Sequence, residues 1–170
     1  MRALIAAFVI VAMALFSYQV HAASDPGGFL GLKWSQSPPE CKKANLCTND
    51  AIAAQDRLTT ETILKGQPAK IEGVKLRWSS FAFNNSKFYL GTAVFDSSKD
   101  SYEALKAVLT KKHGKPTVVT DVATSWTIGN TRVLLSNDKI IGTLMYANVP
   151  LFNEVARVKK YPPYKPPAKK

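Results

Sequence analysis

The two cysteines of the chain, Cys41 and Cys47, form the pair whose type and spacing most directly suggest chemistry. Two nearby thiols can form a structural disulfide, act as a redox pair or bind a metal ion. Redox pairs usually have the C-x-x-C spacing, whereas five residues separate Cys41 from Cys47. A disulfide is therefore the prediction, and a redox or metal role is the alternative. In the chain-entropy model so short a loop contributes only about 2–2.5 kcal/mol, so we expect the bridge mainly to shape the loop after Trp34.

His113 is the only histidine after residue 22, and a group that titrates near neutrality could serve as a general base. It falls in the last turn of a predicted helix, beside Lys111 and Lys112, where cations interact favourably with the carbonyl end of the helix. We therefore expect His113 to be an exposed residue at the helix end. One histidine and one bridged cysteine pair cannot supply the usual ligands of a zinc site, so no metal site is predicted.

Motifs of nucleophilic or cofactor-dependent catalysis are absent from the sequence. There is no G-x-S-x-G nucleophile motif, no G-x-x-x-x-G-K-[ST] phosphate loop and no G-x-G-x-x-G dinucleotide fingerprint. The 12 acidic residues are scattered, and no pair stands out for general acid and base catalysis. The sequence therefore predicts a protein that is not an enzyme, with no catalytic residue and no cofactor.

The carboxyl-terminal segment, residues 157–170, holds six basic side chains and no acid, whereas residues 23–156 have a net charge of only +4. Its Pro/Lys-rich composition predicts an extended, disordered tail. Such a tail could bind nucleic acid, lipopolysaccharide, anionic lipid or an acidic polymer, with Tyr161 and Tyr164 placed for stacking. The alternatives are a solvated tail that aids solubility and a polyproline segment read by a protein partner. The candidate anion-binding residues are Arg157, Lys159, Lys160, Lys165, Lys169 and Lys170.

The first 22 residues have the features of a secretory signal peptide. A short basic start is followed by an apolar stretch at residues 3–16 and by Val20-His21-Ala22, which resembles a cleavage site. The apolar stretch is shorter than the roughly 18–20 residues of a spanning helix, which argues against a membrane anchor. We expect cleavage after Ala22 and a mature protein that is periplasmic or secreted and does not span a membrane. The predicted organisation is a signal peptide (1–22), one domain (23–156) and the basic tail (157–170).

Runs of β-branched and aromatic residues predict an antiparallel sheet of about five to seven strands. Short polar turns, such as Asn84-Asn85-Ser86 and Gly129-Asn130, join consecutive strands as in β-hairpins. With one amphipathic helix between two groups of strands, the most economical fold class is α+β, with the helix covering one face of the sheet. The predicted strands are 29–34, 58–64, 71–83, 88–95, 117–128, 131–135 and 140–149.

One strongly amphipathic helix is predicted over residues 99–113. Asp100 and Glu103 have the spacing of a capping box, and Gly114 suits the left-handed position that often follows a helix. A second, short helix is expected over residues 151–158. The apolar face of the first helix is formed by Tyr102, Leu105, Val108 and Leu109.

The three tryptophans, Trp34, Trp78 and Trp126, all fall in predicted strands. Packing in the core or at a sheet edge is the default expectation for each of them. A cluster of indoles on the surface would instead indicate a binding face.

The order of motifs resembles a group of small exported bacterial proteins. This chain has Phe29-x-Gly31-x-x-Trp34-Ser35-x-Ser37 near its start and Leu109-x-x-x-x-Gly114-x-Pro116 after the helix. The group begins F-x-G-x-x-W-G-x-S and later carries L-x-x-x-x-G-x-P, and the similarity covers most of residues 29–147. The resemblance implies a bacterial envelope protein and transfers no catalytic residue. This chain departs from the pattern at Ser35, where the group has glycine, and in its cysteine loop and basic tail.

Three functions are compatible with these features. The leading hypothesis is a non-enzymatic exported binding module whose basic tail contacts an anionic envelope component or a protein partner. The alternative is an inhibitor or immunity-type protein that plugs another protein with a sheet face or the bridged loop. A hydrolase with an unrecognised site is the least favoured hypothesis.

Overall fold

A computed structural model describes residues 24–51, 61–138 and 140–158 of the chain. The predicted signal peptide, residues 1–22, lies outside the described residues, as does the tail after Val158. Within the described ranges, no helix is long and apolar enough to cross a membrane.

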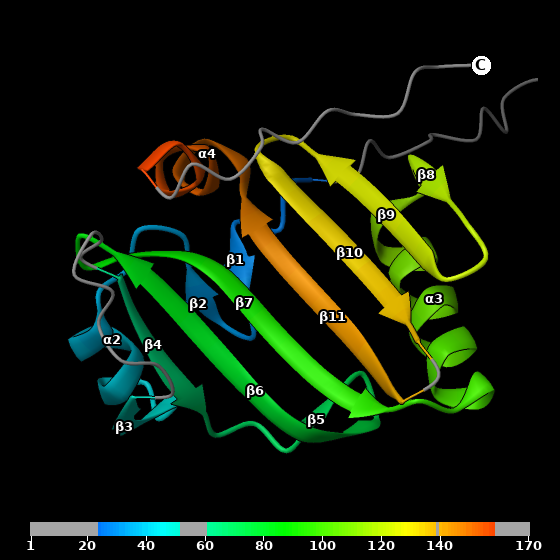
Figure 1. Ribbon diagram of the computed structural model, residues 1–170, viewed down its shortest axis with the longest axis horizontal. Coiled ribbons are helices and arrows are strands. Elements are labelled where there is room, and N and C mark those ends of the chain that lie inside the picture. The colour runs from blue at the N-terminus through cyan, green and yellow to red at the C-terminus, as the bar shows by residue number, and fades with distance from the viewer. Residues whose placement is uncertain (1–23, 52–60, 139, 159–170) are drawn as a thin grey trace, which may run out of the picture.

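A curved antiparallel sheet of nine strands forms the centre of the protein (Figure 1). Most strands pair with a neighbour in the chain, as in the β6–β7 and β10–β11 hairpins, and the pairing of β7 with β11 joins the two halves. The sheet order is β3 (Cys47–Ala51), β4 (Glu61–Gly66), β6 (Val74–Asn84), β7 (Lys87–Asp96), β11 (Ile141–Asn148), β10 (Thr131–Asn137), β9 (Ala123–Ile128) and β8 (Val118–Val119), and β5 (Lys70–Ile71) pairs with the start of β6.

The α+β class is confirmed, but the predicted number of five to seven strands was too small. The predicted strand 71–83 is interrupted at Glu72 and Gly73, which both have positive φ and form the turn between β5 and β6. Likewise, the predicted strand 117–128 is divided into β8 and β9, which fold back on each other. β3 follows a proline-rich segment that reads as a loop, so the sequence pattern did not reveal it.

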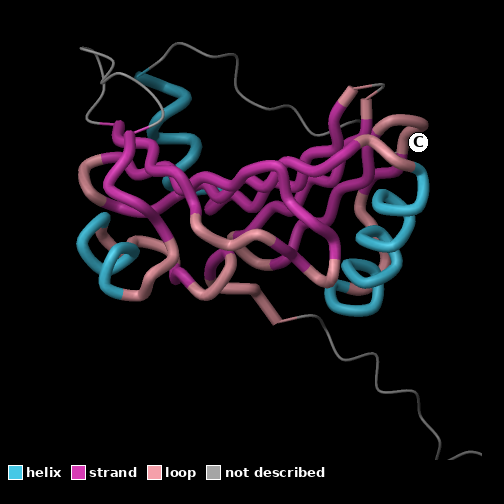
Figure 2. Tube along the Cα trace, turned by 90° about the horizontal axis from the view of Figure 1, so that it is seen from below, coloured by secondary structure: helices cyan, strands magenta, loops and turns pink. Residues whose placement is uncertain are grey.

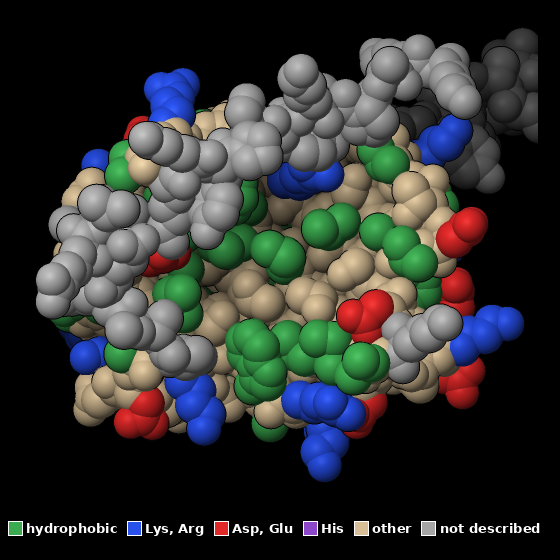
Figure 3. Space-filling model, in the orientation of Figure 1, with side chains coloured by type: hydrophobic (Ala, Val, Ile, Leu, Met, Phe, Trp, Pro, Cys, Tyr) green, Lys and Arg blue, Asp and Glu red, His purple; other side chains and the backbone are tan. Residues whose placement is uncertain are grey.

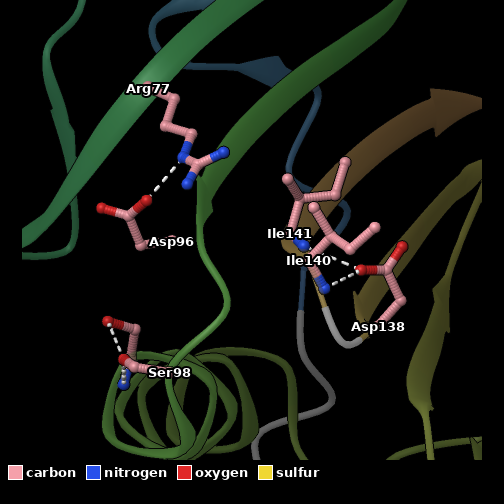
Figure 4. A network of polar contacts seen from close by, with 7 residues as sticks. Arg77, Asp96, Ser98, Asp138, Ile140 and Ile141 are labelled. Atoms are coloured by element: carbon pink, nitrogen blue, oxygen red, sulfur yellow. Dashed lines mark hydrogen bonds and ion pairs between the residues drawn. The ribbon is translucent and has the colours of Figure 1, made fainter.

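The long helix α3 (Lys99–His113) has the bounds that the sequence predicts. Its N-cap, however, is Ser98 and not Asp100, because the Ser98 hydroxyl accepts a hydrogen bond from the backbone N–H of Ser101 at 3.1 Å (Figure 4). Gly114 follows the helix with a positive φ of 78°, which suits glycine, but its ψ of −161° is not that of the left-handed position expected there. Within the described residues the other helices are α2 (Pro38–Lys43) and α4 (Val149–Val158), and α4 begins two residues before the predicted start at 151.

The two faces of the sheet are covered differently. α2, α3 and the N-terminal hairpin lie on one side of the sheet, and α4 lies on the other (Figure 2). The main core fills the first side, because alternate residues of the long strands β6 and β7 point there. Its largest fully buried side chains include Phe81, Phe83, Phe88, Phe95, Leu105, Leu109 and Trp126.

The N-terminal hairpin consists of β1 (Gly28–Phe29) and β2 (Leu32–Lys33). A two-residue turn with positive φ at Leu30 (49°) and Gly31 (92°) joins these strands, in place of the single strand predicted over 29–34. Such turns match the twist of paired strands and favour glycine, which explains why Gly31 occupies this position.

Side chains of the N-terminal segment fill gaps in the main core. The Phe29 ring occupies the space that a side chain at position 91 would need, since a Cβ on Gly91 would lie 2.1 Å from its Cδ1 atom. Trp34 stacks on Phe88 with ring centroids 4.9 Å apart, and its Nε1–H donates to Thr131 Oγ1 at 2.9 Å. The aromatic residues of the F-x-G-x-x-W motif are therefore packing residues.

The same segment is tied to the turn before β10. The Asp25 carboxylate accepts hydrogen bonds from the backbone N–H of Asn130 at 2.7 Å and from the hydroxyl of Thr131. These contacts join residues more than one hundred positions apart in the chain. They fix the start of the described chain against the β9–β10 hairpin.

Cys41 and Cys47 form the predicted disulfide, with their Cα atoms 5.7 Å apart. Both cysteines are buried, and the bridge joins α2 to β3. α2 begins with a capping box that the sequence analysis missed, in which Glu40 accepts from the backbone N–H of Ser37 at 2.7 Å. The bridge and the cap together fix the short helix at the edge of the sheet.

Candidate binding groove

Helix α4 covers only part of the second face of the sheet. Its residues Leu151, Phe152 and Val155 pack on Ala82 and Tyr89 of the β6–β7 hairpin, with the rings of Tyr89 and Phe152 6.3 Å apart. These three helical residues share a face because Val155 is four positions from Leu151 and three from Phe152. Among the described helices only α4 packs on this face, and Figure 3 shows hydrophobic side chains gathered over the part of it that is visible beyond the helix.

Local sequence determines where α4 starts and how it leaves the sheet. The side-chain oxygen of Asn148, the last residue of β11, accepts a hydrogen bond from the backbone N–H of Leu151 at 3.1 Å. Pro150 lies in the first turn, where a missing N–H costs no helical hydrogen bond. The helix therefore begins directly at the end of β11 and turns its apolar face onto the sheet.

A groove of about 360 Å³ lies between α4 and strands β10 and β11. Arg132 pairs across the strands with Ala147, and Leu134 pairs with Met145, so these four side chains lie on the same face and form one continuous wall. The opposite wall comes from α4. The residues that line the groove are Arg132, Leu134, Met145, Ala147, Val149, Phe152 and Asn153.

The lining of the groove suits an apolar guest with a polar end. Five of the seven lining residues are apolar, and the polar groups are the Arg132 guanidinium and the Asn153 amide. Among these lining residues none carries a carboxylate. Apolar walls with a few polar groups are typical of small-molecule sites, whose volumes are about 300–1,000 Å³.

The far end of the same sheet face carries a second apolar area around Trp78. Trp78 pairs with Val94, which pairs with Thr143, so it lies on the face that also carries Met145. The Trp78 side chain is 42% exposed, and Ile140 before β11 is 75% exposed. Trp126 is buried and Trp34 is half-buried, so the default expectation of packing fails only for Trp78.

Polar contacts fix the rim beside this apolar area (Figure 4). Arg77 forms an ion pair with Asp96 across β6 and β7. Asp138 accepts hydrogen bonds from the backbone N–H groups of Ile140 and Ile141 at 2.7 Å each, and these bonds lower the pKa of its carboxyl group. These bonds tie the Asp138 side chain to the start of β11.

A second hollow, of about 390 Å³, lies on the opposite face of the sheet. The N-terminal segment from Pro26 to Lys33 forms most of its wall, and Tyr146 reaches it from β11. Lys112 and Glu72 also line it and form an ion pair at 3.5 Å. Because Phe29 in this wall is part of the main core, we regard this hollow as a by-product of docking the N-terminal hairpin.

The prediction that His113 is exposed is wrong, because only 6% of the residue is accessible. The end of α3 lies against β11, where His113 Nε2 is 2.9 Å from the hydroxyl of Tyr146. Burial and the neighbouring Lys112 lower the pKa of His113, and burial raises the pKa of Tyr146. Both groups are therefore neutral near pH 7, and the phenol is a poor nucleophile there.

The other predicted site residues that the structure describes do not line the groove. The cysteine bridge lies at the β3 edge of the sheet, and Arg157 is exposed near the end of α4. The remaining candidate anion-binding residues, Lys159, Lys160, Lys165, Lys169 and Lys170, lie outside the described residues. Sequence reasoning missed the groove, because alternation along single strands does not show that β10 and β11 are neighbours in this register.

Comparison with known proteins gives one match. The family model described as the TP0088 domain matches residues 50–157, which is more than half of the chain. The matched range contains every residue of the groove and excludes the N-terminal hairpin and the disulfide. No curated protein and no solved structure matches the chain.

Proposed function

Because this chain belongs to the TP0088 domain family, whose matched range contains the whole groove, we propose that its function depends on the groove beside α4. In this proposal the protein is an exported, non-enzymatic binding protein that holds a hydrophobic guest. The observation that carries the proposal is the groove itself, with two apolar walls contributed by a sheet and a helix.

Export to the periplasm or beyond the cell is part of the proposal, and its support is the signal-peptide pattern of residues 1–22. The basic segment 157–170 would hold the protein at an anionic envelope component or a protein partner. Such a segment suits this role because basic clusters attract polyanions without a specific fold. Arg157 starts this segment on the exposed side of α4, the helix that also forms one wall of the groove.

The groove can be tested by filling it. Mature protein, residues 23–170, would be titrated with a neutral solvatochromic dye whose emission shifts in an apolar site. We expect saturable binding by wild type and its loss in Ala147→Phe, because the added ring would occupy space between β11 and α4. Ala107→Phe on the exposed side of α3 is the matched control and should bind dye as wild type does. Unchanged binding by a folded Ala147→Phe protein would exclude the groove as the site.

A second candidate function is that of an inhibitor-type protein, which plugs another protein with the sheet face around Trp78. The exposed Trp78 supports this alternative, because large aromatic residues are enriched at the centres of protein interfaces. This function predicts that the protein captures a partner from envelope extract in a stoichiometric complex. The complex should tolerate high salt and should still form when the residues after Ala156 are removed. Trp78→Ser should abolish that capture, whereas a guest held in the groove should still bind.

A further inference from the structure

We propose that the guest of the groove is a single-chain amphiphile with a carboxylate head, of the fatty-acid class, and that Arg132 binds the head. This inference rests on the proposed function and adds the chemical class of the guest. Its starting point is the unequal distribution of polar groups in the groove, where one cation stands among mostly apolar walls.

Arg132 lies in the groove because of its position in the sheet. It is two residues from Leu134 on β10 and directly across from Ala147 on β11, so its side chain projects from the apolar wall. Arg132 already has a contact within the protein, as a guanidinium beside apolar surface requires. Its five N–H donors can serve a carboxylate in addition to contacts within the protein, and the two groups match in planar geometry.

The charge of the lining selects the sign of the head. None of the seven lining residues is acidic, so an anion entering the groove meets a cation and no opposing carboxylate within that set. Asn153 on α4 offers an amide donor from the opposite wall. A cationic head would meet the Arg132 charge directly, and a neutral head would gain only ordinary hydrogen bonds.

The size and shape of the groove select the tail of the guest. The apolar walls consist of Leu134 and Met145 from the strands and Val149 and Phe152 from the helix. A volume of about 360 Å³ is near the lower limit of small-molecule sites, which favours one alkyl chain over the two chains of a phospholipid. Methionine adapts well to flexible alkyl guests because it is unbranched.

The test compares three probes that share a twelve-carbon chain and differ in the head: laurate, 1-dodecanol and dodecyltrimethylammonium. Binding to mature protein would be measured by displacement of the neutral dye, below the concentrations at which the probes aggregate. We expect laurate to bind about 10-fold or more tightly than the other two, as a charge-assisted hydrogen bond predicts. Arg132→Gln should remove this preference and leave dodecanol binding within about 2-fold of wild type.

Two control variants make the result interpretable. Arg77→Gln removes a cation that is paired with Asp96 at the rim outside the groove, and it should keep the preference for laurate. Arg132→Lys keeps the charge and should retain part of the preference. Equal binding of laurate and dodecanol by wild type would overturn the inference about the carboxylate head. An Arg132→Gln variant that loses both probes equally would overturn it as well. Neither outcome contradicts the proposed function, because wild type still binds a hydrophobic guest. If no probe and no dye binds to wild type, the proposed function fails together with it.

Discussion

Gly91 leaves room for one side chain from a distant part of the chain. A Cβ at this position would overlap the Phe29 ring, with atoms 2.1, 2.4 and 2.8 Å away. We predict that Gly91→Ala lowers the free energy of unfolding by about 1–3 kcal/mol, because the ring and the strand cannot both keep their places. Urea denaturation would measure the loss.

Gly73 provides the control for this effect. It has positive φ but no atom within 4 Å of a built Cβ, so Gly73→Ala reports conformational strain without a clash. In addition, Phe29→Ala should cost less in the Gly91→Ala background than in wild type, because the clash disappears with the ring. Additive losses in this double mutant would show that Phe29 does not fill the gap.

The buried pair of His113 and Tyr146 predicts how stability depends on pH. Because the pKa of His113 is lowered from 6.5 in the folded protein, the unfolded chain binds more protons as the pH falls below 6.5. Stability should therefore be complete above about pH 6.5 and should decrease as the pH falls further, toward the folded-state pKa. The charged groups that act on His113 are Lys112, which opposes protonation, and Glu72, which favours it.

The measurement is the free energy of unfolding between pH 7.5 and 5. His113→Gln keeps a polar partner for the Tyr146 hydroxyl and removes the titrating ring, so the decrease over this range should become smaller. Both proteins also carry carboxylates that titrate at lower pH, and these contribute equally to the two curves. An identical pH dependence in the variant would show that His113 does not titrate differently on unfolding.

At the scale of the elements, the disulfide joins α2 to β3 at the edge of the sheet, away from the long central strands. We predict that replacing Cys41 and Cys47 together by alanine costs about 2 kcal/mol and leaves the domain folded, as expected for a short closed loop. Thermal unfolding and hydrogen exchange at residues 38–51 would measure the loss and its location. Thiol alkylation of wild type without reductant should label neither cysteine, and complete unfolding of the double variant would contradict the prediction.

Elements with local signals could be predicted from the sequence, and elements that depend on distant pairing could not. α3 was located at both ends, because amphipathic spacing and Gly114 are adjacent in the chain. Its cap was assigned to Asp100 because Asp100 and Glu103 have the spacing of a capping box, whereas the helix begins after Ser98. β5 has only two residues, too few to show alternation, and β3 is mostly polar, so it lacks the β-branched and aromatic residues that mark a strand.

The groove could not be predicted because it depends on which strands are neighbours. Its wall exists only because β10 pairs with β11 in the register that places Arg132 opposite Ala147. The burial of His113 has a similar cause, since helix-end position alone favours exposure and the contact with Tyr146 comes from β11. The cysteine bridge, in contrast, followed from two residues close in sequence.

At the scale of the whole molecule, the proposed export predicts a defined mature start. Mass spectrometry of protein recovered from the producing bacterium should show Ala23 as the first residue, because cleavage is expected after Ala22. A variant with Arg at position 22 should accumulate in the precursor form, since small residues are needed there. A mature wild-type protein that retains Met1 would contradict export.

The basic segment predicts salt-sensitive binding to polyanions. Residues 157–170 carry six positive charges, and each phosphate neutralised contributes a log–log salt slope of about −0.7 to −0.9. We predict that mature protein ending at Ala156 binds heparin and anionic vesicles far more weakly than the full-length mature chain. A protein ending at Lys160 keeps α4 whole, which separates loss of charge from damage to the helix. Equal binding by the protein ending at Ala156 would assign the interaction to the fold and favour the inhibitor-type function.

The contacts of Asp25, Phe29 and Trp34 link the order of synthesis to the order of folding. Asp25 and Trp34 are translated early, yet their partners Asn130 and Thr131 come near the end of the domain, as does Tyr146, which contacts Phe29. In a ribosome-bound or translocating chain, the N-terminal segment therefore cannot form all of these contacts until almost all of the domain has been made. Such late closure keeps the region next to the expected cleavage site free of native structure while the chain is still threading, which is the state that a secretion channel requires.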